Sequence, residues 1–496
     1  MIKRYENPAI AKIFSDENKL RFWQDTELAV ILARVELDYF PKKEAEDIVY
    51  LLQAAPIDLT WWQTRDEEIH HDLNAFIDER LQYLPKNLHQ YFHKDMTSYD
   101  TEEPAFARML TEAMKIIEKI NENLGETLTK LVHQHRCHLM SARTHGQGAE
   151  LQSFGARCLT WLMEFMLAVS ALKEANKNLS FSKLSGAIGK YGNLNPQLEQ
   201  RALNFLNLDP FPGATQIMPR ILYAPVAQAL SNLVSVADKI ANDIRLSSRS
   251  GLVLMQEPFK KKQKGSSAMP HKKNPIRTEQ IEGLARLARA YAGAISENIR
   301  TWEERAIEQS CVERVAWPDL FHVTARALTV LDGVLSKLKV YPDNMLEEII
   351  RSRGTIFSNS AKEWLKEKLH PLGIGHEDAY RIIQLASFDL FEVDAERLEI
   401  RDHVASSFQE ASKNLAKIKK LMREKPESLT SLEEFLPEGK LRVSPDLEID
   451  ASQVKKYNLI LKELFAKQGI LESWRSLFEP TQIEKNEAFL HHMIID

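Results

Sequence analysis

The chain has 496 residues, of which 44% are hydrophobic, so it can bury a large core and form more than one domain. This excludes a small disulfide-stapled protein and a disordered one. It carries 65 lysines and arginines against 70 aspartates and glutamates, so no overall charge attracts nucleic acid or an anionic membrane, and any cationic site must be local.

The first 112 residues are expected to form a small N-terminal helical domain. Its short apolar segments are interrupted by Pro41, Pro56, Pro85 and Pro104, and proline ends or kinks helices. Two histidines stand between these segments, His71 in HDLNAF and His93 at the start of HKDMTSYD. A lone histidine is more often structural than functional, and only the polar residues beside these two favour a functional site.

Residues 113–364 are expected to form a central bundle of long helices, because five segments repeat apolar residues in steps of three and four. Glycine and proline, 18 and 20 residues, are also few for a many-stranded sheet, which predicts an all-α protein. One segment reads Phe154, Cys158, Trp161, Phe165, Ala168 and Leu172, and near-heptad spacing of this kind is typical of helices packed at about 20°.

The same segment is apolar on a second side, at Leu162, Met163, Met166 and Leu167. A second partner surface, such as another subunit, would bury these side chains. The apolar stretch from Leu159 to Leu172 contains Glu164 and is shorter than the roughly 20 residues that span a bilayer. The N-terminus lacks an apolar signal core, so we expect a soluble cytoplasmic protein.

The remaining residues, 365–496, are expected to form a helical C-terminal domain. Within it, residues 425–450 contain several prolines and no steady period, so we predict a surface excursion there. The three cysteines, Cys137, Cys158 and Cys311, are odd in number and far apart, which fits neither a disulfide framework nor a zinc ribbon. His133 and Cys137 lie one helical turn apart, but no second cluster completes a metal site.

The most informative segment is GSSAMPHKKNPIRTE, residues 265–279. Gly265, Ser266 and Ser267 form a donor-rich loop, and Asn274 followed by Pro275 predicts a helix start with Asn274 as N-cap. A helix N-terminus beside Lys272 and Lys273 is a place where anions are stabilised. Alternatively, the preceding lysines form a solvated basic linker or a nucleic-acid surface, although interleaved aromatic residues are missing there.

The string GSSAMPHKKN resembles the GSSxMxxKxN signature of the fumarase/aspartase superfamily, and SSAMPHKKNP is close to the form found in its adenylosuccinate lyases. Other segments follow in the family's order: Arg4 and Tyr5, His71 and Asp72 in HDLNAF, His93 with Thr97 and Ser98, His145 in ARTHGQ, Gln216 in ATQ, and Arg305, Ser310 and Arg314 in WEERAIEQSCVER. The resemblance covers most of the chain and implies a three-domain all-α fold.

The resemblance implies β-elimination of fumarate from adenylosuccinate, giving AMP, and from the related carboxamide ribotide SAICAR, giving AICAR, without cofactor or metal. Ser266 is then the base, His145 the acid, and Lys272 with Asn274 stabilises the dianionic intermediate. His93 belongs to the catalytic set, and Glu279 orients a histidine from another subunit. The substrate contacts fall to Arg4, Tyr5, His71, Asp72, Thr97, Ser98, Gln216, Arg305, Ser310 and Arg314.

The resemblance further implies a homotetramer whose active sites are shared between subunits, with an anionic nucleotide as ligand and neither nucleic acid nor membrane as partner. The chain departs from the family's pattern in the parts that read the substrate, at Asp95, Gly148, Leu151, Ile221, Ala306, Glu308, Gln309 and Cys311. Two alternatives stay open: a sister lyase for another succinyl or carboxylate substrate, and a catalytically silent structural homologue.

Overall fold

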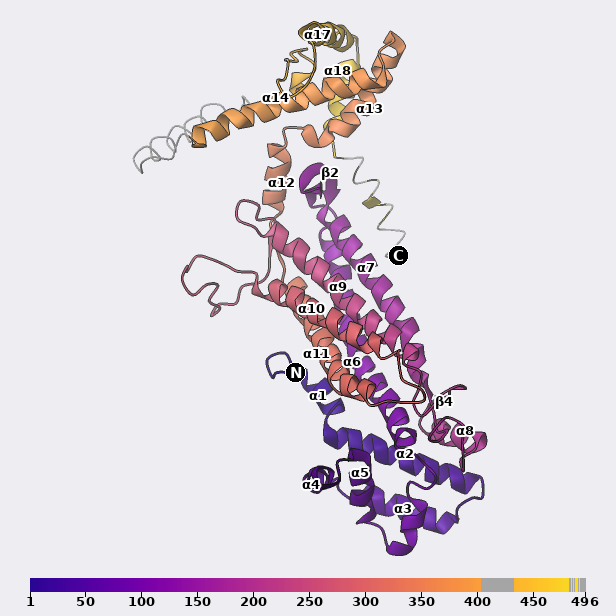
Figure 1. Ribbon diagram of the computed structural model, residues 1–496. Coiled ribbons are helices and arrows are strands. Elements are labelled where there is room, and N and C mark those ends of the chain that lie inside the picture. The colour runs from indigo at the N-terminus through magenta and orange to yellow at the C-terminus, as the bar shows by residue number, and fades with distance from the viewer. Residues whose placement is uncertain (403–431, 481–482, 484, 486, 489, 491–496) are drawn as a thin grey trace. The chain divides into compact units, whose positions relative to one another are not determined.

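The computed structural model describes residues 1–402, 432–480, 483, 485, 487–488 and 490 (Figure 1). The described chain divides into two compact units. The first unit comprises Met1–Lys130, Thr160–Gly251 and Met255–Lys339, and the second comprises Leu131–Leu159, Leu252–Leu254 and Val340–Asp496. The all-α prediction is confirmed. The three-domain division at residues 112 and 364 stays a prediction, and the two compact units have other boundaries.

The N-terminal helices of the first unit are short, as expected, except the second, which has 21 residues, and most begin at a capping side chain. They are α1 (Pro8–Ile13), α2 (Asp16–Glu36), α3 (Lys42–Ala54), α4 (Leu59–Ile69), α5 (Asp72–Leu81) and the 3₁₀ helix η1 (Lys86–Tyr91). Asn7, Ser15, Asp58 and His71 accept hydrogen bonds from first-turn N–H groups, which would otherwise lack partners. Pro41 and Pro85 precede helix starts, as predicted.

The break predicted at Pro104 is wrong. Pro104 lies inside α6, which runs from Ser98 to Gln134. The proline removes one backbone N–H, but the helix is buried on both sides of it, at Tyr99 before it and at Ala105 and Ala113 after it, and this packing holds the helix together.

The bundle consists of α6, α7 (Phe154–Asn176), α9 (Ala224–Ser247), α10 (Ile276–Glu297) and α11 (Glu308–Leu335). Helices α9, α10 and α11 pack on one another within the first unit (Figure 1). The core positions predicted on α7 are buried, and Trp161, fully buried, donates its indole N–H to Asp243 at 2.8 Å. On the second side of α7, Met166 and Leu167 are 50% and 68% exposed.

Short elements connect the bundle helices of the first unit: η2 (Lys177–Ser180), α8 (Pro196–Phe205), η3 (Arg220–Leu222), and the strands β3 (Phe181–Ser182), β4 (Asp209–Pro210) and β5 (Met255–Gln256). Strands β3 and β4 are parallel. Helix α7 together with η2 is apolar and long enough, by length and composition alone, to cross a membrane, which corrects the expectation that this segment is too short. The correction arises because the helix extends beyond both ends of the apolar stretch; core helices pass the same test.

The second unit contains an antiparallel hairpin of β1 (Leu139–Thr144) and β2 (Gln147–Ser153). His145 and Gly146 form its turn with φ of 53° and 78°. The other elements are β6 (Lys339–Val340), which begins in the first unit, α12 (Pro342–Arg351), η4 (Thr355–Phe357), α13 (Ser358–Leu369), η5 (His370–Leu372), α14 (His376–Asp402), α16 (Leu432–Phe435), α17 (Ala451–Phe465), α18 (Ile470–Arg475) and η7 (Ser476–Phe478).

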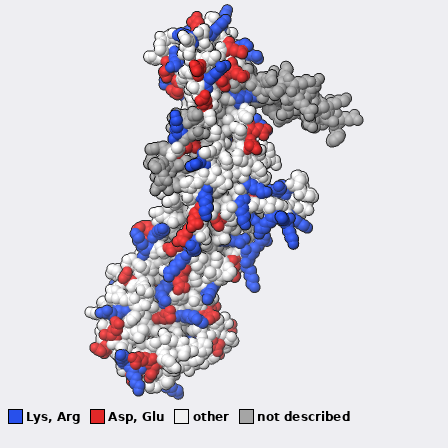
Figure 2. Space-filling view, turned by 180° about the vertical axis from the view of Figure 1, so that it is seen from behind, with Lys and Arg blue, Asp and Glu red and all other residues white. Residues whose placement is uncertain are grey.

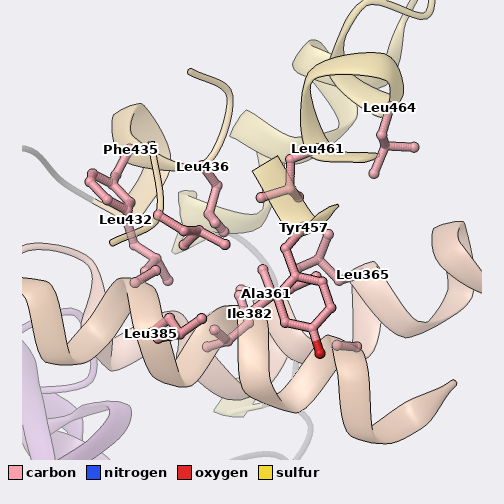
Figure 3. Packing of buried hydrophobic residues seen from close by; sticks show 14 of the residues in the cluster. Ala361, Leu365, Ile382, Leu385, Leu432, Phe435, Leu436, Tyr457, Leu461 and Leu464 are labelled. Carbon is pink, nitrogen blue, oxygen red and sulfur yellow. The ribbon is translucent and has the colours of Figure 1, made fainter. Parts of the chain in front are cut away.

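Residues 425–431 of the predicted surface excursion at 425–450 lie outside the described residues. Residues 436–450 form no helix or strand, as an excursion requires, but the described part is also anchored in the core. Leu432, Phe435 and Leu436 point toward Leu385 and Ile382 in the core of the second unit (Figure 3). Leu432 and Phe435 are three residues apart, so one helical turn places both on the same buried face despite the nearby prolines.

Candidate active site

A cavity of about 340 Å³ lies in the first unit, where the N-terminal helices meet the bundle. Its wall is mixed. Aromatic side chains lie beside charged ones, and the lining includes Phe14, Lys19, Trp23, Trp62, Asp72, Tyr99, Glu102, Phe106, Ser310, Glu313 and Arg314. Three of these residues, Asp72, Ser310 and Arg314, belong to the predicted substrate contacts, although they come from segments far apart in the sequence. A concave site in which aromatic and polar side chains converge is typical of a small-ligand site.

Arg314 joins two segments of the cavity wall. Its guanidinium forms an ion pair with Asp72 at 2.7 Å and its Nε donates to the Ser310 hydroxyl at 3.2 Å. Burial lowers the pKa of Arg314, but Asp72, Glu102 and Tyr99 raise it by more, so the net shift is upward. The guanidinium therefore keeps its positive charge and is still 55% exposed, which leaves donors for an anion.

Arg305 lies next to this group. Its Nη1 donates to the side-chain oxygen of Gln216 at 3.0 Å, and its guanidinium lies over the Tyr99 ring, 4.3 Å from the centroid. The Arg305 Nε is buried without a hydrogen-bond partner. Buried donors normally have a hydrogen-bond partner, so a ligand atom that accepts from the Arg305 Nε would be stabilised here.

Thr97 and Ser98, the TS pair, stand at the start of α6, and a buried network holds them in place. The Thr97 N–H donates to Asp100 at 2.9 Å, and Asp100 forms an ion pair with Lys183 at 2.7 Å, both side chains being 0% exposed. Lys183 also donates to the backbone oxygen of Gln216 at 3.0 Å. The start of α6 and the Gln216 segment are therefore fixed to each other.

His93 precedes the TS pair and contacts Glu27 of α2, a residue that the sequence did not single out. Nδ1 of His93 is 2.8 Å from Oε1 of Glu27, and the backbone N–H of His93 donates to the other oxygen at 3.2 Å. The neighbouring Asp95, where the family has glycine, adopts φ of 62°, a conformation that favours glycine. Its carboxylate accepts hydrogen bonds from Arg34 and Asn193, which offset that strain.

Tyr99 and Glu102 were not predicted as site residues. They stand three positions apart on α6 and face the cavity together. Burial, followed by the negative charge of Glu102, raises the pKa of Tyr99 to about 12. Burial, followed by the charge of Asp72, raises the pKa of Glu102 to about 8, even though Arg314 and Arg305 act in the opposite direction. Tyr99 and Glu102 follow Thr97 and Ser98 closely in the sequence, and this position was the signal that could have identified them as site residues.

The signature loop, residues 260–275, connects β5 to α10. Figure 2 shows lysine and arginine side chains gathered on this projection, where Lys260, Lys261, Lys262, Lys264, Lys272 and Lys273 are exposed. Ser266 is half-buried, and its Oγ accepts the N–H groups of Ala268 at 3.3 Å and Met269 at 3.1 Å. Donors of this kind stabilise a serine oxygen that carries negative charge.

The prediction of Asn274 as N-cap is wrong. Helix α10 begins at Ile276, Pro275 occupies the N-cap position, and that residue offers no capping side chain. Glu257 fills the role instead, because its carboxylate accepts the N–H groups of Arg277 and Thr278 at 3.1 Å. A carboxylate from outside the helix satisfies the same donors and is favoured by the helix dipole.

The described residues do not bring the loop to the cavity within one chain. Ser266, Lys272, Asn274 and Glu279 are absent from the cavity wall, and Glu279 forms an ion pair with Arg245 at 3.7 Å. The loop projects from the bundle where α10 begins, whereas α2 and α5 lie beyond the other end of that helix (Figure 1).

The other predicted residues lie as follows. Arg4 and Tyr5 belong to an N-terminal segment that is tied to α11, because the Met1 amino group pairs with Asp319 at 2.9 Å and the Asn7 N–H donates to His322 at 3.0 Å. His71 caps α5 with an exposed ring, and its Nδ1 accepts the Asn74 N–H at 3.3 Å.

His145 is exposed in the hairpin turn of the second unit.

Comparisons with known proteins show the family to which the chain belongs. Residues 3–289 match a family model described as lyase. Adenylosuccinate lyase from Synechocystis sp. is 35% identical over 80% of this chain and 91% of its own length, and adenylosuccinate lyase from Thermotoga maritima is 35% identical over 77% and 87%. A fumarate lyase structure from Mesorhizobium sp. has a TM-score of 0.72 at 20% identity, covering 96% of this chain and 99% of its own.

Proposed function

Since the chain belongs to the adenylosuccinate lyase family of the fumarase/aspartase superfamily, we propose that it is a carbon–nitrogen lyase that cleaves adenylosuccinate to AMP and fumarate. The same elimination from SAICAR gives AICAR. The observation that carries the proposal is the cavity in which Asp72, Ser310 and Arg314 meet, with Arg305 and Gln216 beside it. These residues are the predicted nucleotide contacts, and they come from three separate segments.

The cations of this site suit an anionic nucleotide. Arg305 and Arg314 both retain donors for phosphate or carboxylate oxygens, and guanidinium groups bind such oxygens in pairs. Arg4 and Tyr5 lie on the segment tied to α11, the helix that also carries Arg314, so they complete the phosphate end of the site. His71, Thr97 and Ser98 supply further polar contacts.

The reaction needs a base, an acid and fixed charge for the intermediate. Ser266 removes the proton from the succinyl carbon next to the carboxylate, and the electron pair moves into that carboxylate to form a dianionic intermediate. Lys272 and Asn274 stabilise this charge. The intermediate then expels the nitrogen as the carbon–carbon double bond of fumarate forms, and His145 protonates the leaving nitrogen. His93, which is oriented by Glu27, completes the proposed catalytic set.

The active site is assembled from several subunits in this proposal. The signature loop and the cavity do not meet within one chain, so a second chain has to supply Ser266 and Lys272. The exposed Met166 and Leu167 of α7 offer an apolar surface for that assembly. We infer a soluble cytoplasmic homotetramer that acts on a small anionic nucleotide, without cofactor, nucleic acid or membrane, in which Glu279 orients a histidine of a neighbouring chain.

The test is fumarate release by the purified protein, followed by absorbance, with adenylosuccinate as substrate. We expect turnover by the parent protein and a loss of at least about 100-fold in the folded Ser266→Ala variant, since a general base contributes about that much or more. Ser267→Ala is the matched control and should retain more activity. Turnover of another succinyl derivative without turnover of adenylosuccinate would identify a sister lyase, and no turnover of any would favour a silent homologue.

A further inference from the structure

Glu102 is the cavity residue to which the proposed reaction assigns no role. It lies on the face of α6 that also presents Tyr99 and Phe106 to the cavity, at helical steps of three and four. Its side chain is partly buried, and among the described residues no basic side chain forms an ion pair with it. A structural ion pair therefore does not explain why an acidic side chain lies at this position.

The charged groups around Glu102 come from every element that packs at this end of the cavity. The groups that act on it directly are Glu103 of the same helix, Asp72 of α5, Arg314 of α11 and Arg305 of the loop before α11. The wider wall adds Asp16 and Lys19 of α2, Asp66 of α4, Arg220 of η3 and Glu313 of α11.

Most of these charges already have partners. Arg314 pairs with Asp72, and Arg220 lies between Glu103 and Glu313. Burial disfavours the ionised form of Glu102 most and Asp72 repels it, and the positive charges of Arg314 and Arg305 offset these two effects only in part. Burial and this repulsion give Glu102 a pKa of about 8, so its carboxyl group is mostly neutral at pH 7 and carries an O–H donor.

We propose that Glu102 is a specificity-determining residue that binds the nucleotide as a neutral carboxylic acid, donating its O–H to an acceptor atom of the ligand, and that its ionisation expels the ligand. This inference rests on the proposed function. A purine nucleotide presents ring nitrogens and phosphate oxygens, which accept hydrogen bonds from a neutral acid and are repelled by a carboxylate. A neutral Glu102 thus avoids adding a second negative charge beside Asp72, which lowers the repulsion of a polyanionic ligand.

The experiment measures the affinity of the full-length protein for AMP by isothermal titration calorimetry between pH 6.5 and 9.5. We expect the affinity of the parent protein to fall about tenfold per pH unit above pH 8, because binding then requires a proton. Glu102→Gln keeps the shape and a donor, so it should bind AMP at pH 7 within a few-fold of the parent and lose the decline. Glu112→Gln, an exposed position on the same helix, should behave as the parent does.

A second measurement needs no variant. Titrations in buffers of different ionisation enthalpy report the protons taken up on binding, and the parent should take up about half a proton per site at pH 8. If the parent shows neither this uptake nor the decline, or if Glu102→Gln retains both, the inference is overturned while the proposed function stands. If the parent neither binds AMP nor releases fumarate from adenylosuccinate, the proposed function fails and the inference with it.

Discussion

Nδ1 of His93 lies 2.8 Å from Oε1 of Glu27, and the Thr101 hydroxyl donates to the same oxygen at 2.6 Å. Burial lowers the pKa of His93, but the charge of Glu27 and the hydrogen bond between His93 and Glu27 raise it by more, so the net shift is upward. A carboxylate that is 1% exposed thereby favours the protonated form of an imidazole that lies shortly before α6.

The pair predicts a pH-dependent contribution to stability. Because the folded pKa of His93 is raised, the folded state holds the proton more tightly than the unfolded state, and the stabilisation is complete below the unfolded pKa of about 6.5. It is lost as the pH rises through the higher folded value. The free energy of unfolding of the parent protein, compared with that of His93→Gln, should therefore show its largest difference at low pH. Urea unfolding from pH 5.5 to 8.5 measures this, with exposed His133→Gln as the control that should show no such trend.

Arg220 carries the second prediction. It is 3% exposed and forms ion pairs with two buried carboxylates, Glu103 and Glu313, the latter through two hydrogen bonds of 2.9 Å. Arg220→Met leaves both carboxylates without their partner and should lower the free energy of unfolding by about 3–5 kcal/mol. Arg351→Ala breaks an exposed pair with Glu347 and should change it by less than about 1 kcal/mol. Equal losses in both variants would contradict a structural role for the buried group.

Gly189 and Gly192 form a matched pair of substitutions. Both have positive φ, 72° and 64°, but a Cβ on Gly189 would lie 2.0 Å from the Ala214 carbonyl oxygen, whereas one on Gly192 meets nothing within 4 Å. Gly192→Ala should cost only the backbone strain, about 1–2 kcal/mol. Gly189→Ala adds steric overlap and should cost about 2–5 kcal/mol.

The Gly189 substitution should also affect binding, because Ala214 lies two residues before Gln216. We expect Gly189→Ala to weaken AMP binding in calorimetry more than Gly192→Ala does, each measured on folded protein. Equal affinities for the two variants would show that the Gln216 segment tolerates displacement.

Shared active sites predict complementation between inactive variants. Ser266→Ala and His145→Ala should each be inactive alone, and mixing them under conditions that allow subunit exchange should restore part of the activity, since some sites then contain both parent residues. Fumarate release measures the recovery, and labelled subunits verify the exchange. No recovery despite verified exchange would argue that Ser266 and His145 act from the same chain.

The site residues stay a prediction, of which the structure brings three to one cavity, whereas the contacts that hold them in place were not predicted. Periodicity alone located the buried faces of the bundle helices, because a helix repeats every 3.6 residues whatever its partners are. The motif residues Asp72, Ser310 and Arg314 were also found, and the structure places them around one cavity.

Partners distant in the sequence could not be predicted. Glu27 contacts His93 from 66 positions away, and Glu257 caps α10 in place of Asn274 from 20 positions away. No local spacing encodes such contacts, because they depend on how whole helices pack. The raised pKa of Glu102 likewise depends on burial between packed helices and on Asp72, which belongs to another helix.

The two ends of the Gly265–Lys272 segment touch, since a Cβ on Gly265 would lie only 1.9 Å from the Lys272 carbonyl oxygen. Ser266 and Lys272 therefore belong to one loop whose ends are in contact, and their backbones do not move independently. In the proposed reaction, a movement that carries the Ser266 hydroxyl toward a bound dicarboxylate would also carry the backbone of Lys272, so the proton acceptor and its counter-charge would reach the ligand together.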